Sequence, residues 1–320
     1  MARPSRKKRV FNTVLVTGGA GYVGTSLVPL LLSNGYTVRV LDSLRLGGVG
    51  LLPVLAHPNL EFIRGDVRNR ADVAKAMRGV DAVIHLAAIV GAPACQKDPK
   101  LSYDTNVNGT KILVEAAGRK IPVVFASTGS NYGKMKEAIC TETTPLNPLS
   151  HYGRQKTKAE EIVKKNKEYV IFRFATAFGI SPRMRLDLMP NDFTYRAVRD
   201  RSLIVYEKHF MRTFIHVRDM ARAFLFALEQ YKKMQGEIYN VGDDSLNFTK
   251  EEVCLMIKKK TDYFLHFADV GKDIDQRDYL VSYKKLGSLG YKTTVSMEQG
   301  IDELIRAAHL IDVQNPHYNA

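Results

Sequence analysis

Cysteine is scarce in this chain, which has three cysteines in 320 residues, at positions 95, 140 and 254. An odd number of widely separated cysteines excludes a disulfide framework, and their spacing does not fit a metal cluster. Proteins with so few cysteines are typical of reducing compartments. We therefore expect a cytoplasmic protein with no bound metal.

Long apolar runs are also missing. The apolar stretch from Val23 to Leu32 falls short of the roughly 18 residues that a membrane span needs. The basic start of the chain leads into a strand-like segment and not into the small-residue cleavage site of a signal peptide. The sequence therefore predicts a soluble protein with no membrane partner.

Acidic residues are outnumbered by lysine and arginine, 33 to 47, which gives a formal net charge of +14. Part of the excess lies in a tail that contains Arg3, Arg6, Lys7, Lys8 and Arg9. This tail is either an arm for nucleic acid or targeting, or a solvated terminus without a role. Because no basic stripe is interleaved with aromatic residues, we expect no nucleic-acid partner. The remaining positive charge suits ligands that carry a pyrophosphate.

Apolar β-branched runs alternate with helical patterns in the first half of the chain. The expected strands are 10–17, 37–41, 60–64, 82–86, 123–127 and 169–174, and the expected helices are 22–34, 72–77, 102–119 and 152–165. Such alternation predicts an α/β fold with a doubly wound parallel sheet and helices on both faces.

The pattern loosens after about residue 175. Residues 178–192 are rich in Pro, Gly, Arg and Met, strands are expected at 214–217 and 238–241, and a helix at 219–230 lies between them. Two later helices begin at capping boxes, at Thr249 and Ser296. We expect a main domain at 10–176 to which 211–244 returns, a smaller C-terminal lobe at 177–210 and 245–312, and a flexible tail at 1–9.

A glycine-rich turn follows the first expected strand and reads Gly18-Gly19-Ala20-Gly21-Tyr22-Val23-Gly24. Gly18 permits the tight bend, Gly21 lets the backbone approach a pyrophosphate, and Gly24 lets the helix pack closely on the sheet. The unpaired N–H groups at the start of the helix then face the phosphates. Because the turn follows a strand and opens a helix, it predicts dinucleotide binding.

Polar and small residues end the next strands. Asp42 can accept hydrogen bonds from both ribose hydroxyls of adenosine and would repel a 2′-phosphate, which favours NAD over NADP, although Arg45 weakens this preference. Asp66, followed by Val67, is either a partner of the adenine amino group or a helix N-cap. The fourth strand ends in Leu86-Ala87-Ala88, which suits packing along the dinucleotide.

Tyr152 and Lys156 are four residues apart, so a helix places them on one face. They follow the fifth expected strand, at the edge of the sheet where ligands bind. To act as a base near neutral pH, a tyrosine needs its pKa lowered from about 10 to about 7, roughly 4 kcal/mol, and a nearby ammonium acts in that direction. The alternative is a solvated helix surface that carries Arg154, Lys156 and Lys158.

Together these motifs resemble the extended short-chain dehydrogenase/reductase family, and within it the NAD-dependent nucleotide-sugar epimerases and dehydratases. The resemblance covers about residues 13–307 and rests on the glycine turn, Asp42, Asp66, His85-Leu86-Ala87-Ala88, Asn106-Val107-Asn108-Gly109-Thr110, the hydroxyl-rich segment 127–133 and the Tyr152/Lys156 pair. It implies a Rossmann fold, bound NAD, a nucleotide-sugar substrate and a homodimer.

The resemblance also implies roles for individual residues. Tyr152 would be the acid and base, Lys156 would lower its pKa, and Thr128, five residues before Gly133, would be the catalytic hydroxyl. The implied cofactor residues are Gly18, Gly21, Tyr22, Val23, Gly24, Asp42, Asp66, Val67, Leu86, Ala87, Ala88, Asn106, Tyr152, Lys156 and Phe174. The implied substrate residues are Val90, Ser127, Thr128, Arg212 and Arg277, the two arginines as pyrophosphate ligands. The smaller lobe at 177–210 and 245–312, including the segment 178–192, would bind the substrate. Cys95 is either a wall of the sugar pocket or a small loop residue.

The residues after Thr128 narrow the reaction. Gly129 and Ser130 stand where dehydratases of the family carry Asp-Glu, and the Glu of its decarboxylases and the Cys of its 3,5-epimerases are missing too. The remaining chemistry is hydride removal from a sugar carbon, at C4, while Tyr152 takes the hydroxyl proton. If the keto sugar turns over before the hydride returns, the enzyme is a 4-epimerase, which we expect. If the keto sugar leaves, it is a dehydrogenase or reductase.

A protein of a different class would sense the dinucleotide without turning over a substrate. The intact set of Tyr152, Lys156 and Thr128 argues against such a regulator.

Overall fold

The computed structural model describes residues 9–133, 139–268 and 280–311. Its main element is a seven-stranded sheet in which all neighbouring strands are parallel. The strands lie in the order β11 (Glu237–Val241), β7 (Tyr169–Phe174), β5 (Val123–Thr128), β4 (Ala82–His85), β1 (Thr13–Thr17), β2 (Thr37–Asp42) and β3 (Leu60–Arg64). The predicted doubly wound parallel sheet is confirmed, and the basic tail, except Arg9, lies outside the described residues.

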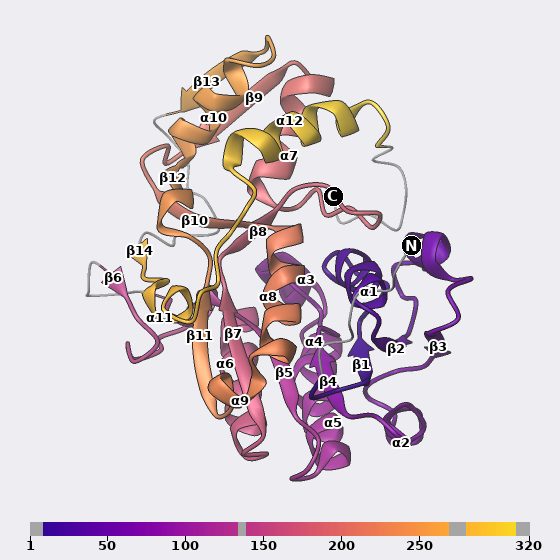
Figure 1. The fold of residues 1–320 in the computed structure, drawn as a ribbon. Coiled ribbons are helices and arrows are strands. Elements are labelled where there is room, and N and C mark those ends of the chain that lie inside the picture. The colour runs from indigo at the N-terminus through magenta and orange to yellow at the C-terminus, as the bar shows by residue number, and fades with distance from the viewer. Residues whose placement is uncertain (1–8, 134–138, 269–279, 312–320) are drawn as a thin grey trace.

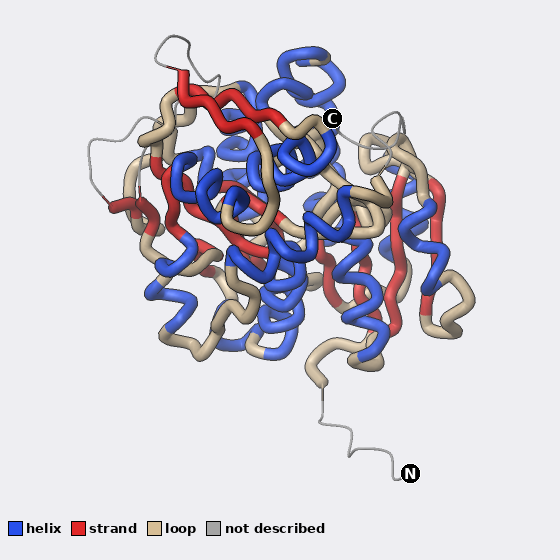
Figure 2. Tube along the Cα trace, turned by 90° about the horizontal axis from the view of Figure 1, so that it is seen from above, coloured by secondary structure: helices blue, strands red, loops and turns tan. Residues whose placement is uncertain are grey.

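Helices cover both faces of this sheet (Figures 1 and 2). On one face the helices are α1 (Gly24–Ser33) and α8 (Val217–Glu229), and on the other they are α2 (Arg70–Met77), α5 (Thr110–Ala117) and α6 (His151–Lys164). A sheet buried on both faces needs strands that are apolar throughout. Val14, Leu15 and Val16 of β1 meet this need, since all three are fully buried and point alternately to the two faces.

The helix expected at 102–119 is interrupted. It consists of α4 (Pro99–Tyr103), a wider π-helical turn η2 (Asp104–Gly109) and α5. The hydroxyl of Thr110 donates to the carbonyl of Asn106 inside this turn, at 2.7 Å. Such turns often occur at functional sites, and this one contains Asn106, a predicted cofactor residue. The expected long helix is therefore present, with one wider turn inside it.

The expectation that all of 211–244 returns to the main sheet was also wrong. Only β11 joins it, whereas β10 (Met211–His216) lies between β8 (Thr176–Phe178) and β12 (Asn247–Thr249) in a separate sheet. The cause lies at Ala175, the single residue between β7 and β8. Its N–H still donates to Val241 on β11, after which the chain leaves the main sheet and pairs with β10. The wider division into two domains stays a prediction.

A second group of elements lies above the main sheet in Figure 1. It contains α7 (Met189–Arg199), α10 (Lys250–Lys258), α12 (Met297–Ala308) and the pair β9 (Ser202–Tyr206) and β13 (Phe264–Ala268). Phe178, Phe214 and Ile301 are fully buried in its core. The remaining short elements are η1 (Val49–Val54), α3 (Ala92–Lys97), η3 (Gly129–Asn131), β6 (Ile139–Cys140), α9 (Tyr231–Met234), η4 (Asp244–Leu246), β14 (Leu280–Val281) and α11 (Lys284–Gly287).

The helix starts of this second group follow the sequence closely. Both predicted capping boxes are present, at Thr249 with Glu252 and at Ser296 with Gln299.

Among the residues that the structure describes, no helix is both long enough and apolar enough to cross a membrane.

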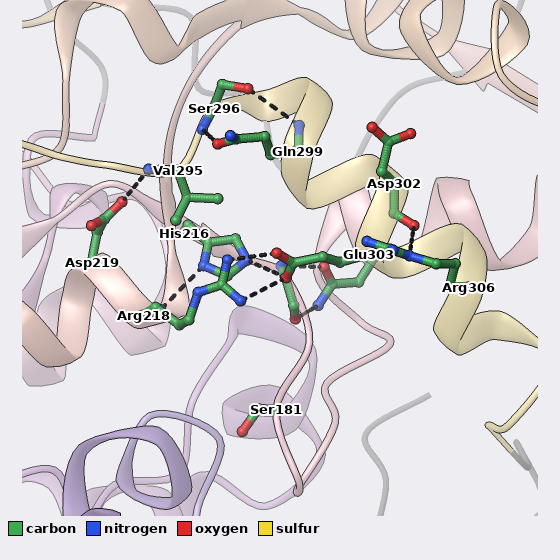
Figure 3. Close-up of polar contacts among 12 residues, drawn as sticks. Ser181, His216, Arg218, Asp219, Val295, Ser296, Gln299, Asp302, Glu303 and Arg306 are labelled. Atoms are coloured by element: carbon green, nitrogen blue, oxygen red, sulfur yellow. Dashed lines mark hydrogen bonds and ion pairs between the residues drawn. The ribbon is translucent and has the colours of Figure 1, made fainter. Parts of the chain in front are cut away.

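Two buried polar side chains join α8 to the segment around α12 (Figure 3). The carboxylate of Asp219 accepts the backbone N–H of Val295 at 3.0 Å. The Nδ1 atom of His216 accepts the backbone N–H of Arg218, and its Nε2 lies 3.4 Å from the carboxylate of Glu303. Burial is the main reason that the pKa of His216 is lowered to about 4, so the ring is neutral at pH 7.

The substitution Asp219→Ala should destabilise the fold strongly. It leaves the backbone N–H groups of Thr294 and Val295 without their acceptor and Arg222 without its carboxylate. We expect a loss of about 3 kcal/mol in the free energy of unfolding, measured by chemical denaturation. Asp262→Ala, which removes an exposed carboxylate, is the matched control and should change stability little. Equal effects of the two variants would contradict the assignment.

Candidate active site

A cavity of about 940 Å³ lies at the carboxyl ends of the central strands. Its lining comes from both groups of elements, from the glycine turn after β1 to Phe214 of β10. Ligands of open parallel sheets bind at this edge. Among the described residues, every predicted site residue except Asn106 lines this cavity. Arg277 lies outside the described residues.

The glycine turn has the geometry that a dinucleotide needs. Gly18 has φ +73°, and a Cβ there would lie 2.7 Å from the backbone nitrogen of Ala87. A Cβ at Gly24 would lie 2.5 Å from the carbonyl oxygen of Gly19, so the helix can begin here only with glycine. Gly21 faces the cavity with no side chain between its backbone and a ligand. The turn therefore fits the pyrophosphate of a dinucleotide.

Asp42 lies at the end of β2 with both carboxylate oxygens oriented by the backbone. The N–H of Ala20 donates to Oδ2 at 3.0 Å and the N–H of Leu44 donates to Oδ1 at 2.8 Å. Burial raises the pKa of Asp42, and these two N–H groups oppose the rise. Each oxygen keeps a further lone pair for a ribose hydroxyl.

Asp66 lines the cavity and does not cap a helix. The cap of α2 is Asn69, whose side chain accepts the N–H groups of Ala71 and Asp72. Asp66 instead forms an ion pair with Arg68, at 2.6 Å, and this contact holds the pKa of its carboxyl below the ordinary value. Of the two interpretations of Asp66, the N-cap was wrong. Arg68, which also lines the cavity, was not predicted.

Tyr152 and Lys156 lie on α6, whose start is capped by the hydroxyl of Ser150. Lys156 is 3% exposed, and its Nζ lies 3.9 Å from the centre of the Phe125 ring. Burial lowers the pKa of Lys156 to about 7, although the carboxylate of Glu160 acts in the opposite direction. The pair thus combines a cavity-lining phenol with a buried amine, so the alternative of a solvated surface does not hold for Lys156.

The two hydroxyls at the end of β5 have different surroundings. Thr128 accepts the N–H of Ser130 and donates to the Ser130 hydroxyl, both at 3.1 Å, at the cavity wall. Ser127 donates to the carboxylate of Glu160 at 2.5 Å and is buried. Thr128 is therefore the better placed of the two candidates for contact with a ligand.

Glu160 was missed in the sequence, although it follows Lys156 by four residues on the same helix face. It is 1% exposed and pairs with the buried guanidinium of Arg173 at 2.8 Å. Its carboxylate also accepts from Ser127 and from Asn131, which ties α6 and β7 to the end of β5. The helical spacing from Lys156 was the available signal.

Asn106 does not reach the cavity. Its buried amide accepts the N–H of Ile89 and donates to the carbonyl of the same residue and to Gln155. It therefore orients the loop in which Val90 and Gly91 line the cavity. Cys95 is also fully buried, with its thiol directed at the Ile89 carbonyl, so it is a small interior residue and not a wall of the pocket.

The far end of the cavity is rich in cations. Arg212 lines it, as predicted, and Lys250 lines it as well, with its ammonium donating to the carbonyl of Tyr206 at 2.9 Å. Arg185 and Asp187 form an ion pair at 2.6 Å near Gly91. The sequence marked only the segment around these two residues, because an ion pair between loop residues leaves no periodic pattern.

Comparisons with known proteins agree with this geometry. The family model described as "NAD dependent epimerase/dehydratase family" matches residues 14–242. The chain belongs to this family. The predicted resemblance and the assignment of NAD as cofactor are therefore confirmed.

Individual relatives match along nearly the whole chain. A "Putative UDP-glucose 4-epimerase" of Methanocaldococcus jannaschii is 31% identical over 310 residues, which is 91% of this chain and 97% of the relative. The structure of the UDP-glucose 4-epimerase of Thermus thermophilus with NAD is similar with a TM-score of 0.81 and 28% identity, over 93% of this chain and 99% of the other. The structure of the UDP-glucuronic acid 4-epimerase of Bacillus cereus, with UDP-glucuronic acid and NAD, is similar with a TM-score of 0.84 and 26% identity. This match also covers 93% of this chain and 99% of the other.

The buried amine of Lys156 predicts a specific dependence of stability on pH. Its pKa of about 7 in the folded protein lies below the unfolded value of about 10.4, so the unfolded chain binds the additional proton between these limits. Lys156→Met should therefore stabilise cofactor-free protein at pH 6, by up to about 4 kcal/mol, and this gain should vanish as the pH approaches 10. Denaturant titrations across this range measure it. Lys158→Met, at an exposed position, should show no such trend, and a pH-independent gain for Lys156→Met would contradict the assignment.

Proposed function

We propose that this protein is an NAD-dependent 4-epimerase of nucleotide sugars. One observation carries the proposal: Tyr152, Lys156 and Thr128 line the same cavity as the glycine turn and Arg212. With a volume of about 940 Å³, the cavity has room for two ligands, a dinucleotide on the glycine turn and an activated sugar beyond it. The relatives named as UDP-glucose 4-epimerases support uridine diphosphate sugars as the first substrates to test.

The cofactor site is assigned to residues near the first three strands. The N–H groups of the glycine turn would hold the pyrophosphate, Asp42 the ribose hydroxyls and Asp66 the adenine. When bound, NAD supplies the oxidising chemistry, because its nicotinamide ring accepts a hydride from a sugar carbon and returns it. Phe174 and Lys156 line the part of the cavity that we assign to the nicotinamide end.

The protein side of the reaction is acid–base catalysis by Tyr152. Its phenolate would take the proton of the C4 hydroxyl, and the same phenol would give it back. The ammonium of Lys156 favours the phenolate, since an adjacent positive charge stabilises the ionised form. The Thr128 hydroxyl, which already exchanges hydrogen bonds with Ser130, would bind the same sugar oxygen and share its developing charge.

Epimerisation fits better than elimination because a second catalytic acid or base is missing from the expected place. Gly129 and Ser130, directly after Thr128, carry no carboxylate. Asp187 lines the cavity near Gly91, but its carboxylate is paired with Arg185 at 2.6 Å. A dehydrogenase of the same family remains the second candidate, since it needs the same catalytic residues and differs in whether the keto sugar leaves.

Two finer assignments remain proposals. We propose a homodimer and a cytoplasmic location, in keeping with the family resemblance and the free cysteines. The outer positions of α5 and α6 are charged, with Lys111, Glu115 and Lys158 exposed, so a dimer through these helices would have a polar interface. Sedimentation of the purified protein at several salt concentrations tests this association.

The substitution Tyr152→Phe should abolish turnover while it leaves cofactor binding intact. We expect kcat for UDP-glucose to fall by about 10³-fold, because the ring keeps its packing but loses the proton-transfer group. The product is measured as UDP-galactose, and NAD affinity is measured separately by calorimetry. Tyr103→Phe, on the exposed side of α4, is the matched control and should retain full activity.

The same assay separates the two candidate reactions. An epimerase gives product without net change in the absorbance of reduced cofactor, whereas a dehydrogenase accumulates NADH in proportion to substrate consumed. Stoichiometric NADH would contradict the 4-epimerase proposal. Full activity of Tyr152→Phe would contradict the role of Tyr152 in either reaction.

A further inference from the structure

A loop from the second group of elements crosses to the cofactor side of the cavity. We call residues 179–187, between β8 and α7, the 179–187 loop. The buried side chain of Asn191 closes it: Oδ1 accepts the N–H of Gly179 and Nδ2 donates to the carbonyl of Arg185, both at 2.9 Å. Because one fully buried amide binds both Gly179 and Arg185, the segment between these two residues has a defined shape.

The start of the loop is held from two sides. Gly179 has φ +101°, and a Cβ there would lie 2.0 Å from Nε2 of His216, so the imidazole ring packs directly on the backbone. The ring is itself held by Arg218 and Glu303, as Figure 3 shows. On the other side, the carbonyl of Gly179 accepts the hydroxyl of Tyr22, in the glycine turn, at 2.6 Å.

The next residues lie against the start of α1. The hydroxyl of Ser181 donates to the carbonyl of Tyr22 at 2.7 Å and lies 2.8 Å from the hydroxyl of Thr25. Pro182 packs beside Gly50, where a Cβ would meet the proline ring at 3.3 Å. A segment that the sequence assigned to substrate binding therefore lies beside the helix start that faces the cofactor phosphates.

Arg183 follows and lines the cavity, 5% exposed. Burial is the main reason that its pKa is lowered to about 10, and Arg185 and Arg45 lower it too, whereas Asp187 and Asp42 raise it. It is still charged at neutral pH. Among the described residues, the guanidiniums of Arg183, Arg185 and Arg45 thus interact with two carboxylates, those of Asp42 and Asp187, and Asp187 is already paired with Arg185. This local excess of positive charge at Asp42 suits an anionic ligand.

We propose that Arg183, presented by the 179–187 loop, binds the adenosine half of NAD, phosphates included, and keeps the cofactor bound during turnover. The proposal rests on the proposed function, since a 4-epimerase must retain its reduced cofactor until the sugar is reduced again. A dehydrogenase, by contrast, must exchange it. Arg183 would thus be a cofactor-binding residue supplied by the part of the chain that otherwise covers the substrate.

The test compares Arg183→Met with Arg199→Met in protein stripped of NAD. Arg199 is exposed on α7, so its variant removes one positive charge away from the cavity. We expect Arg183→Met to raise the Kd for NAD by about 10- to 100-fold, as for the loss of a charged hydrogen bond, and Arg199→Met to leave it unchanged. Calorimetry measures both, and equal affinities of the two variants would overturn the proposal.

Binding of a second ligand, uridine diphosphate, tests whether Arg183 lies in the cofactor half or in the substrate half of the cavity. Arg183→Met should leave the affinity for uridine diphosphate unchanged, whereas Arg212→Met should weaken uridine diphosphate and not NAD. The reverse pattern would make Arg183 a substrate residue and overturn the proposal. If Arg183→Met fails to fold, as judged by circular dichroism, Arg183→Lys retains the charge and should give a smaller loss. These assays measure binding only and involve no turnover. Failure of the 4-epimerase proposal would be seen in a different assay, as the absence of UDP-galactose.

Discussion

The arrangement of the site depends on one buried ion pair, between Glu160 and Arg173. Two charges that are nearly inaccessible to water cost several kcal/mol to bury unless their hydrogen bonds are satisfied. Here the carboxylate accepts from Arg173, Ser127 and Asn131, and so joins β7, α6 and the end of β5. Lys156 is on the same face of α6, and Thr128 follows Ser127. The ion pair therefore sets where Lys156 and Thr128 face the cavity, although neither Glu160 nor Arg173 lines it.

The positive charge of the cavity matches the negative charge of the ligands that we propose for it. Lys156, Arg183, Arg212 and Lys250 all line it, and all are at most 6% exposed. Such a cluster of basic groups suits two ligands that each carry a pyrophosphate. The basic residues of the cavity also account for part of the net charge of +14. Nucleic-acid binding by the protein surface was the alternative explanation for this charge. The excess of lysine and arginine is therefore in part a property of the site.

Local patterns sufficed to predict the residues whose role depends on neighbours along the chain. The glycine turn, Asp42 and the Tyr152/Lys156 pair each follow from a strand end or a helical repeat, and all line the cavity. Residues that act through distant partners were missed or misplaced. Asn106 binds Ile89 across 17 positions, and Arg173 binds Glu160 across 13. The departure of β10 from the main sheet was missed because pairing of strands with similar composition is decided by tertiary packing.

The 179–187 loop links the two halves of the cavity in a way that bears on the type of reaction. Gly179 is held by Tyr22 from the glycine turn and by His216 at the end of β10, so movement of the loop would disturb both sides. A cofactor that is exchanged after each turnover needs a path out of the cavity in every cycle. A loop whose ends are closed by Asn191 and whose centre binds Tyr22 and Thr25 makes such a path costly. A reaction that returns its electrons to the same sugar needs no such path, and this favours epimerisation over net oxidation.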